Sequence, residues 1–95
     1  MGMDLEGAGG YFRWTNSGWD DVLNSAESNG WQPTGTGPPR GTLKADWPGN
    51  YYGTEGQRVY ARDAKRLAEA LKRGDGNGYY RKFIKFCRAG SFRIY

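Results

Sequence analysis

Histidine is absent from this sequence, and cysteine occurs only once, as Cys87. The missing histidine removes the most common general base and metal ligand, and it excludes a metal site built from cysteine and histidine. A single cysteine cannot form a disulfide within the chain, so nothing indicates an oxidising compartment. We therefore expect a protein that is not an enzyme and that holds neither a metal nor a cofactor.

Long apolar stretches are also missing. No run approaches the roughly 18 residues that a membrane-spanning helix requires. Segment 1–10 has neither the basic part nor the hydrophobic part of a secretion signal. We expect a cytoplasmic protein without a membrane partner, in which segment 1–10 is flexible.

Aliphatic residues are few, whereas aromatic residues are plentiful. Hydrophobic residues make up 37% of the chain and aromatic residues alone reach 16%. A small number of large side chains must therefore supply much of the core. Because 95 residues are enough for one hydrophobic core, we expect residues 1–95 to form a single small domain.

Three segments carry apolar residues at the spacing i, i+3, i+4 and i+7, which is typical of amphipathic helices. The first follows Ser17, a candidate N-cap, and the second covers residues 64–73 after the candidate N-cap Asp63. The third begins near Tyr80 and carries Cys87 on its apolar stripe. We expect Cys87 to be an unreactive thiol in the core, because free cysteine is among the most buried residue types.

Short aromatic or alternating segments predict strands at 11–14, 57–60 and 91–95, and we expect the last of these to pair with the first. The order of the elements predicts an α+β fold. In this fold about three short strands form a sheet, three amphipathic helices pack on one face of it, and a long ordered loop rich in aromatic residues connects the two halves.

The predicted loop covers residues 31–56, which contain all four prolines and show no regular period. Two interpretations remain open for its aromatic residues. They either line a groove for a peptide or small ligand, or they fold the loop onto the sheet as part of the core. The candidate ligand or partner surface consists of Trp31, Arg40, Trp47, Tyr51, Tyr52 and Gln57.

The net charge of +4 is distributed unevenly. Residues 1–57 contain three basic and seven acidic side chains, whereas residues 58–95 contain eleven basic and three acidic ones. An anionic partner would therefore bind the C-terminal part. The candidate anion surface lies on the third predicted helix and consists of Arg81, Lys82, Lys85 and Arg88. The alternative is that these are the ordinary charges of a solvated helix face.

Several segments together resemble those of uncharacterised small bacterial proteins. These are GWQPTGT (30–36), WPGNY (47–51), GQRV (56–59), DAKRLAEAL (63–71) and FCRAGSF (86–92), with the apolar stripe of residues 19–26. The resemblance covers most of the chain from Trp19 onward. It implies a bacterial and cytoplasmic origin, but no activity.

These observations favour a binding or protein-interaction module that engages another protein through the aromatic loop or the basic helices. The alternative is an accessory domain that binds nucleic acid through the basic C-terminal helices. The oligomeric state does not follow from the sequence.

Overall fold

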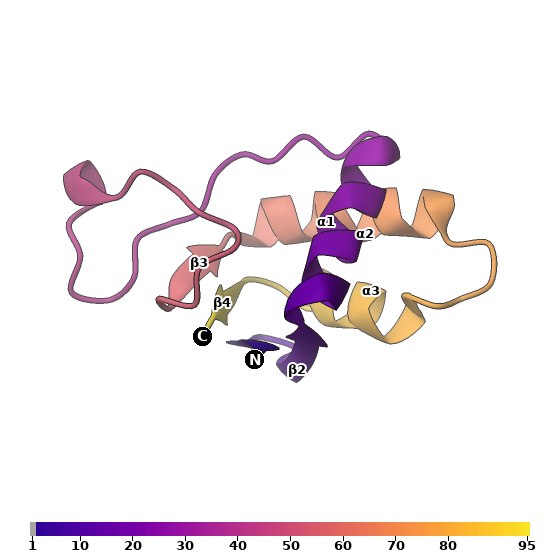
Figure 1. The fold of residues 1–95 in the computed structure, drawn as a ribbon, viewed down its shortest axis with the longest axis horizontal. Helices are drawn as coiled ribbons and strands as arrows, with labels where there is room; N and C mark the ends of the chain where they lie inside the picture. The colour runs from indigo at the N-terminus through magenta and orange to yellow at the C-terminus, as the bar shows by residue number, and fades with distance from the viewer. Residues whose placement is uncertain (1) are drawn as a thin grey trace.

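The computed structural model describes residues 2–95, which form a four-stranded antiparallel sheet and three α-helices (Figure 1). The elements in chain order are β1 (Gly2–Gly7), β2 (Gly10–Thr15), α1 (Asn16–Ser28), the 3-10 helix η1 (Lys44–Asp46), β3 (Gln57–Val59), α2 (Ala61–Gly74), α3 (Arg81–Arg88) and β4 (Phe92–Ile94). The prediction of a small α+β domain is confirmed, with four strands instead of three.

The additional strand, β1, lies in the segment that we expected to be flexible. Met3 and Leu5 are buried and alternate with outward-facing Asp4 and Glu6, as in a strand with one face on the core. The prediction of flexibility is therefore wrong for residues 2–10, which form β1, a tight turn and the start of β2. Met1, which that prediction also included, lies outside the described residues.

The strand order in the sheet is β2-β1-β4-β3. β1 pairs with β2 on one side and with β4 on the other, so the predicted pairing of strands 11–14 and 91–95 is wrong. The reason is that the unpredicted strand β1 occupies the position between them. β3 completes the sheet by pairing with the free side of β4.

The first two helices begin differently from the prediction. Thr15, not Ser17, caps α1, because the Thr15 hydroxyl accepts a hydrogen bond from the Gly18 amide at 3.0 Å. α2 begins at Ala61, and its N-cap position is Tyr60. Asp63 therefore lies inside the first turn of α2, where it is completely buried and bonds to the loop instead of capping the helix.

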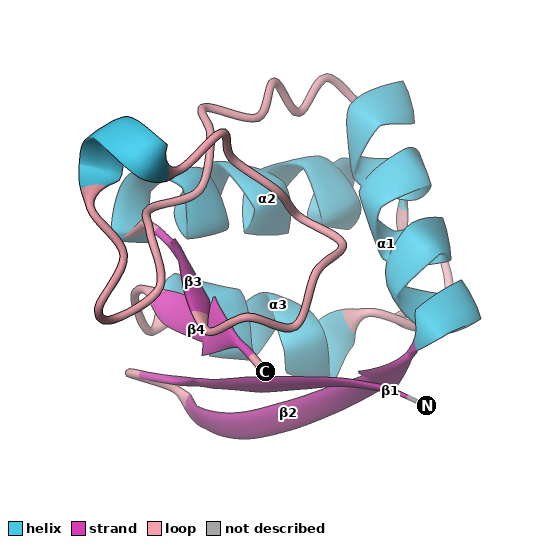
Figure 2. Ribbon diagram, turned by 60° about the vertical axis from the view of Figure 1, so that its left-hand side comes forward, coloured by secondary structure: helices cyan, strands magenta, loops and turns pink. Residues whose placement is uncertain are grey.

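The helices cover the face of the sheet that carries the apolar side chains (Figure 2). Phe83 of α3 lies near the centre of this core, with its ring 6.0 Å from that of Trp19 and 5.9 Å from that of Phe86. Cys87 is also buried there, as predicted, and burial raises the pKa of its thiol. Aromatic rings thus form much of the contact between the helices and the sheet.

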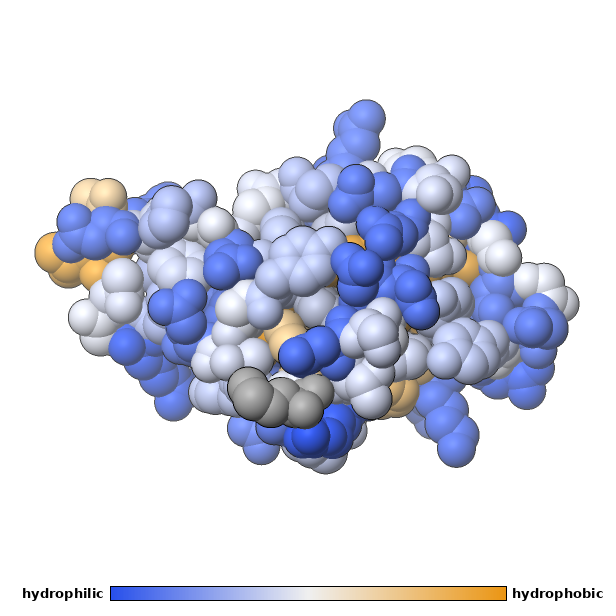
Figure 3. Space-filling view, in the orientation of Figure 1, coloured by the Kyte–Doolittle hydropathy of each residue, from blue (hydrophilic) through white to orange (hydrophobic). Residues whose placement is uncertain are grey.

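The long loop extends the molecule at one end, where η1 lies farthest from the helices (Figure 1). The molecule measures 40 × 24 × 23 Å as a result. Figure 3 shows a largely hydrophilic surface on this side, with an apolar patch over η1, where Leu43 is 71% exposed. No helix within residues 2–95 combines the length and apolar character needed to span a bilayer.

Candidate functional site

Asp63 anchors the aromatic loop to the first turn of α2. Its carboxylate accepts hydrogen bonds from the Trp31 indole at 3.0 Å and from the Tyr51 hydroxyl at 2.6 Å. The Tyr51 hydroxyl in turn accepts a hydrogen bond from the Gly35 amide at 2.9 Å. Burial, reinforced by the neighbouring carboxylate, raises the pKa of Tyr51 well above its ordinary value. The polar ends of Trp31 and Tyr51 are thus bonded inside the domain.

A second set of bonds holds the tip of the loop. The Thr36 hydroxyl accepts a hydrogen bond from the backbone amide of Asn50 at 2.9 Å and donates one to the backbone carbonyl of Asn50 at 3.1 Å. The Trp47 indole donates to the Thr36 carbonyl at 3.1 Å. Gln57, which is completely buried, donates to the carbonyls of Asn50 and Gly53 at 3.1 and 2.6 Å. These bonds fold residues 36–53 back on themselves.

The structure therefore separates the residues of the predicted ligand surface. Trp31 and Gln57 do not belong to an open surface, because both are buried and their polar groups are already bonded. The ring of Trp31 packs edge-to-face on that of Tyr51, with centroids 5.4 Å apart. Tyr52, 53% exposed, and Arg40 reach the solvent, although the Tyr52 hydroxyl donates to the Asp20 carboxylate at 3.3 Å. Trp31 and Tyr51 pack against each other beside α2, and Trp31 also lines a hollow of about 310 Å³.

The structure brings three of the four residues of the predicted anion surface together around one groove. A groove of about 600 Å³ lies between the C-terminal end of α2 and the outer side of α3. Its cationic lining includes Arg81, Lys85 and Arg88 of α3, and Lys72 of α2 adds a fourth positive charge. Lys82 is exposed on α3 but does not line the groove.

The turn between the two helices shapes one end of the groove. The Asp75 carboxylate accepts hydrogen bonds from the amides of Tyr79 and Tyr80, at 2.9 and 2.8 Å. Gly78 has a φ of 77°, a conformation that a residue with a side chain rarely adopts, and this lets the chain enter α3 after a short turn. Asp75 is the one acidic residue in the lining, and its carboxylate already accepts hydrogen bonds from two backbone amides.

The groove is strongly positive. Its lining contains four basic side chains and one acidic one, Asp75. Within residues 2–95 the structure shows one ion pair, between Arg13 and Asp4, so none of the four groove cations has a carboxylate partner. A concave surface with walls of low polarity concentrates the electrostatic potential of such charges. Ile84, nearly buried, supplies an apolar part of the lining.

The described part of the chain, residues 2–95, contains no group of three or more His, Cys, Asp or Glu side chains placed to hold a metal ion. The arrangement of the groove is suited to binding an anion, since it presents four positive charges around a hollow.

Comparisons of the chain with models of protein families, with curated proteins and with solved structures gave no match in any of the three.

Proposed function

We propose that this protein is a non-enzymatic binding module that takes an acidic segment of a partner protein into the groove between α2 and α3. The observation that carries this proposal is the set of four cations without carboxylate partners around one hollow: Lys72, Arg81, Lys85 and Arg88. Placing several like charges together is unfavourable unless an opposite charge joins them. A bound acidic segment supplies that charge.

The lining of the groove favours a peptide chain over nucleic acid. Sites for single-stranded nucleic acid use aromatic side chains on which bases stack, and the lining of this groove contains none. Ile84 and the aliphatic stems of the lysines and arginines offer apolar contacts to the side chains that separate acidic residues in a peptide.

Nucleic acid is the second candidate, because the positive surface continues beyond the groove. Arg62, Lys65 and Lys82 are exposed on the same two helices. A duplex or single strand that follows these charges would contact phosphates along both helices and would bind with a strong dependence on salt.

We also propose that the protein works in the bacterial cytoplasm. The lone cysteine is buried, so the fold needs no oxidising environment. The bacterial part of this proposal is what the resemblance of segments such as GWQPTGT (30–36) to small bacterial proteins implies.

The test is a titration followed by NMR, with two probes: a short peptide of glutamate and leucine, and a mixed-sequence single-stranded oligonucleotide. We expect the peptide to shift the amides of residues 76–88. The double variant Arg81→Gln/Arg88→Gln should bind it roughly tenfold more weakly or worse, because charge-assisted hydrogen bonds are lost.

Arg62→Gln is the matched control, since Arg62 is exposed on α2 but does not line the groove. It should leave peptide affinity unchanged. Preferential binding of the oligonucleotide, weakened equally by Arg62→Gln and by the double variant, would replace the peptide proposal with the nucleic-acid one.

A further inference from the structure

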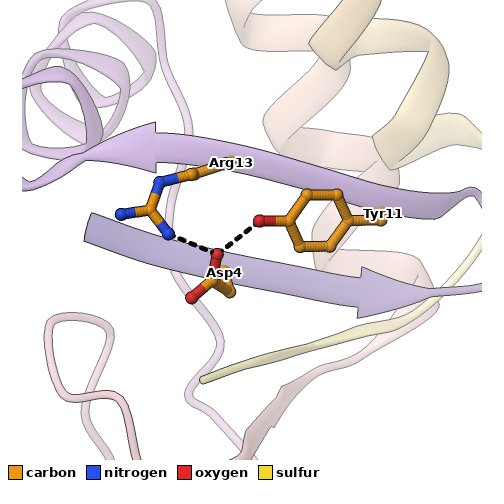
Figure 4. Close-up of polar contacts among 3 residues, drawn as sticks. All are labelled: Asp4, Tyr11 and Arg13. Atoms are coloured by element: carbon orange, nitrogen blue, oxygen red, sulfur yellow. Dashed lines mark hydrogen bonds and ion pairs between the residues drawn. The ribbon is translucent and has the colours of Figure 1, made fainter.

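The face of the sheet opposite the helices carries a second arrangement of charges, and one pair of them is balanced. Figure 4 shows Asp4 of β1 bonded to two side chains of β2. Arg13 donates to the Asp4 carboxylate at 2.7 Å, and the Tyr11 hydroxyl donates to the same oxygen at 2.5 Å. These bonds, first that of Tyr11 and then that of Arg13, lower the pKa of Asp4. Asp4 and Arg13 thus neutralise each other, whereas Glu6, the other acidic residue of β1, forms no ion pair within residues 2–95.

The half of this face formed by β3 and β4 is not balanced. Arg58 and Arg93 face each other directly across the two strands, and both alternate with side chains that point into the core. Like charges at directly opposed positions of an antiparallel pair destabilise the sheet. Neither arginine forms an ion pair within residues 2–95. Glu6 of β1 lies directly opposite Arg93 on its other side, but it forms no ion pair with either arginine. The three positions together therefore keep a net positive charge.

Arg93 is held in place by the backbone of the loop. Its guanidinium donates to the Gly56 carbonyl at 2.7 Å and to the Pro38 carbonyl at 3.4 Å. These bonds use one nitrogen, Nη1, and leave the other donors of the guanidinium free for a ligand. The position of Arg93 is thus set before any ligand arrives.

A third arginine joins the pair from the loop. Gly37 forms two backbone hydrogen bonds with Arg58, at 2.8 and 3.0 Å, which attach the start of the segment 37–40 to the outer edge of β3. Arg40, at the end of that segment, lines the same hollow as Arg58 and Arg93. The hollow has a volume of about 420 Å³, and Glu6 is the one acidic residue in its lining.

We propose that this hollow binds the phosphate group of a phosphomonoester through Arg40, Arg58 and Arg93. Guanidinium groups match the geometry of phosphate oxygens and form paired hydrogen bonds with them. A phosphate dianion bound between Arg58 and Arg93 attracts both guanidinium groups and offsets the repulsion between them. Ser91 and Tyr95, also in the lining, offer hydroxyl donors.

The three arginines line one hollow of about 420 Å³, which has room for a single phosphate group. The phosphate belongs either to a phosphorylated side chain of a protein or to a phosphorylated small molecule. This site lies on the open face of the sheet, and so it does not depend on the groove between α2 and α3.

Isothermal titration and NMR with two pairs of probes test the proposal. One pair is a phosphoserine peptide and its unphosphorylated counterpart, and the other is glycerol phosphate and glycerol. We expect only the phosphorylated member of a pair to bind and to shift the side-chain Nε–Hε signals of Arg58 and Arg93. Binding of the peptide alone identifies a phosphoprotein, and binding of glycerol phosphate identifies a small-molecule ligand.

The variants Arg58→Gln and Arg40→Gln should each weaken phosphate binding roughly tenfold, because each removes a charge-assisted contact. Both side chains are exposed, and no hydrogen bond ties either one to the fold within residues 2–95. In phosphate-free buffer, Arg58→Gln should raise the melting temperature, because the repulsion from Arg93 disappears. A lower melting temperature would contradict the repulsion on which the proposal rests.

Arg62→Gln should leave phosphate affinity unchanged. Arg88→Gln should also leave phosphate affinity unchanged while weakening the binding of the acidic peptide. The proposals for the two sites are therefore tested independently. Equal binding of phosphorylated and unphosphorylated probes, or an unchanged affinity in both Arg58→Gln and Arg40→Gln, would overturn the proposal.

Discussion

The aromatic loop and the groove between α2 and α3 both contain residues that the sequence suggests for binding, but their polar groups differ in whether the protein itself bonds them. In the loop, the indoles of Trp31 and Trp47 and the amide of Gln57 all bond to groups of the protein itself. In the groove, the cations have no carboxylate partner. Aromatic residues with satisfied polar ends support the fold, whereas clustered charges without partners indicate a place for a ligand.

The largest expected effect tests whether the buried aromatic residues stabilise the fold. Trp19 is completely buried against Phe83, and its indole donates to the Tyr51 carbonyl at 2.7 Å. Trp19→Ala should lower the free energy of unfolding by about 3 to 5 kcal/mol, because it leaves a large cavity and an unpaired carbonyl. Denaturant unfolding measures this change.

Tyr52→Ala is the matched control from the loop, because Tyr52 is exposed. It should change stability by no more than about 0.5 kcal/mol. If Tyr52→Ala cost as much as Trp19→Ala, the division of the aromatic residues into core and surface would be incorrect.

A smaller loss is expected from Asp63→Asn. The amide keeps one acceptor oxygen but presents a donor group to either Trp31 or Tyr51, so one buried bond is lost. We expect a cost of about 1 to 3 kcal/mol and faster proteolysis within residues 31–56. A stable variant with an unchanged cleavage pattern would show that Asp63 does not anchor the loop.

The raised pKa of Tyr51 predicts a loss of stability in alkali. The unfolded chain loses this proton near the ordinary pKa of 10.0, while the folded protein retains it to a higher pH. The contribution of Tyr51 is therefore complete below pH 10.0 and declines as the pH rises above it. Tyr51→Phe should flatten the fall of unfolding free energy between about pH 10 and 12. A slope as steep as that of the wild type would exclude this role.

The smallest effect on stability is expected in the groove. Arg88→Gln should leave the free energy of unfolding within about 0.5 kcal/mol of the wild type, because Arg88 is exposed and forms no ion pair within residues 2–95. Its affinity for the glutamate and leucine peptide should nevertheless fall. A marked loss of stability would mean that the groove is part of the structural framework, like the loop.

The sequence was sufficient to predict the three helices, because an apolar stripe at helical spacing depends on local pattern alone. It also placed Arg81, Lys85 and Arg88 on one helix face. Lys72 joins them only through the packing of α2 against α3, which the pattern of one helix does not reveal.

Features that depend on distant contacts were not predicted. The alternation of Met3 and Leu5 with acidic residues was hidden by the glycines around it, and the strand they form pairs with β4 at the other end of the chain. Asp63 has the spacing of an N-cap, but its actual partners, Trp31 and Tyr51, precede it by many residues. The opposition of Arg58 and Arg93 likewise follows from strand pairing alone.

The most direct measurement uses the indole signals of the tryptophans as reporters of the loop and the amides of residues 76–88 as reporters of the groove. Both are observed in one NMR titration of the wild-type protein with the glutamate and leucine peptide. Our account predicts that the groove amides shift with a single affinity while the indole signals of Trp31 and Trp47 stay in place. Shifts of those indoles, with the groove amides unchanged, would contradict it.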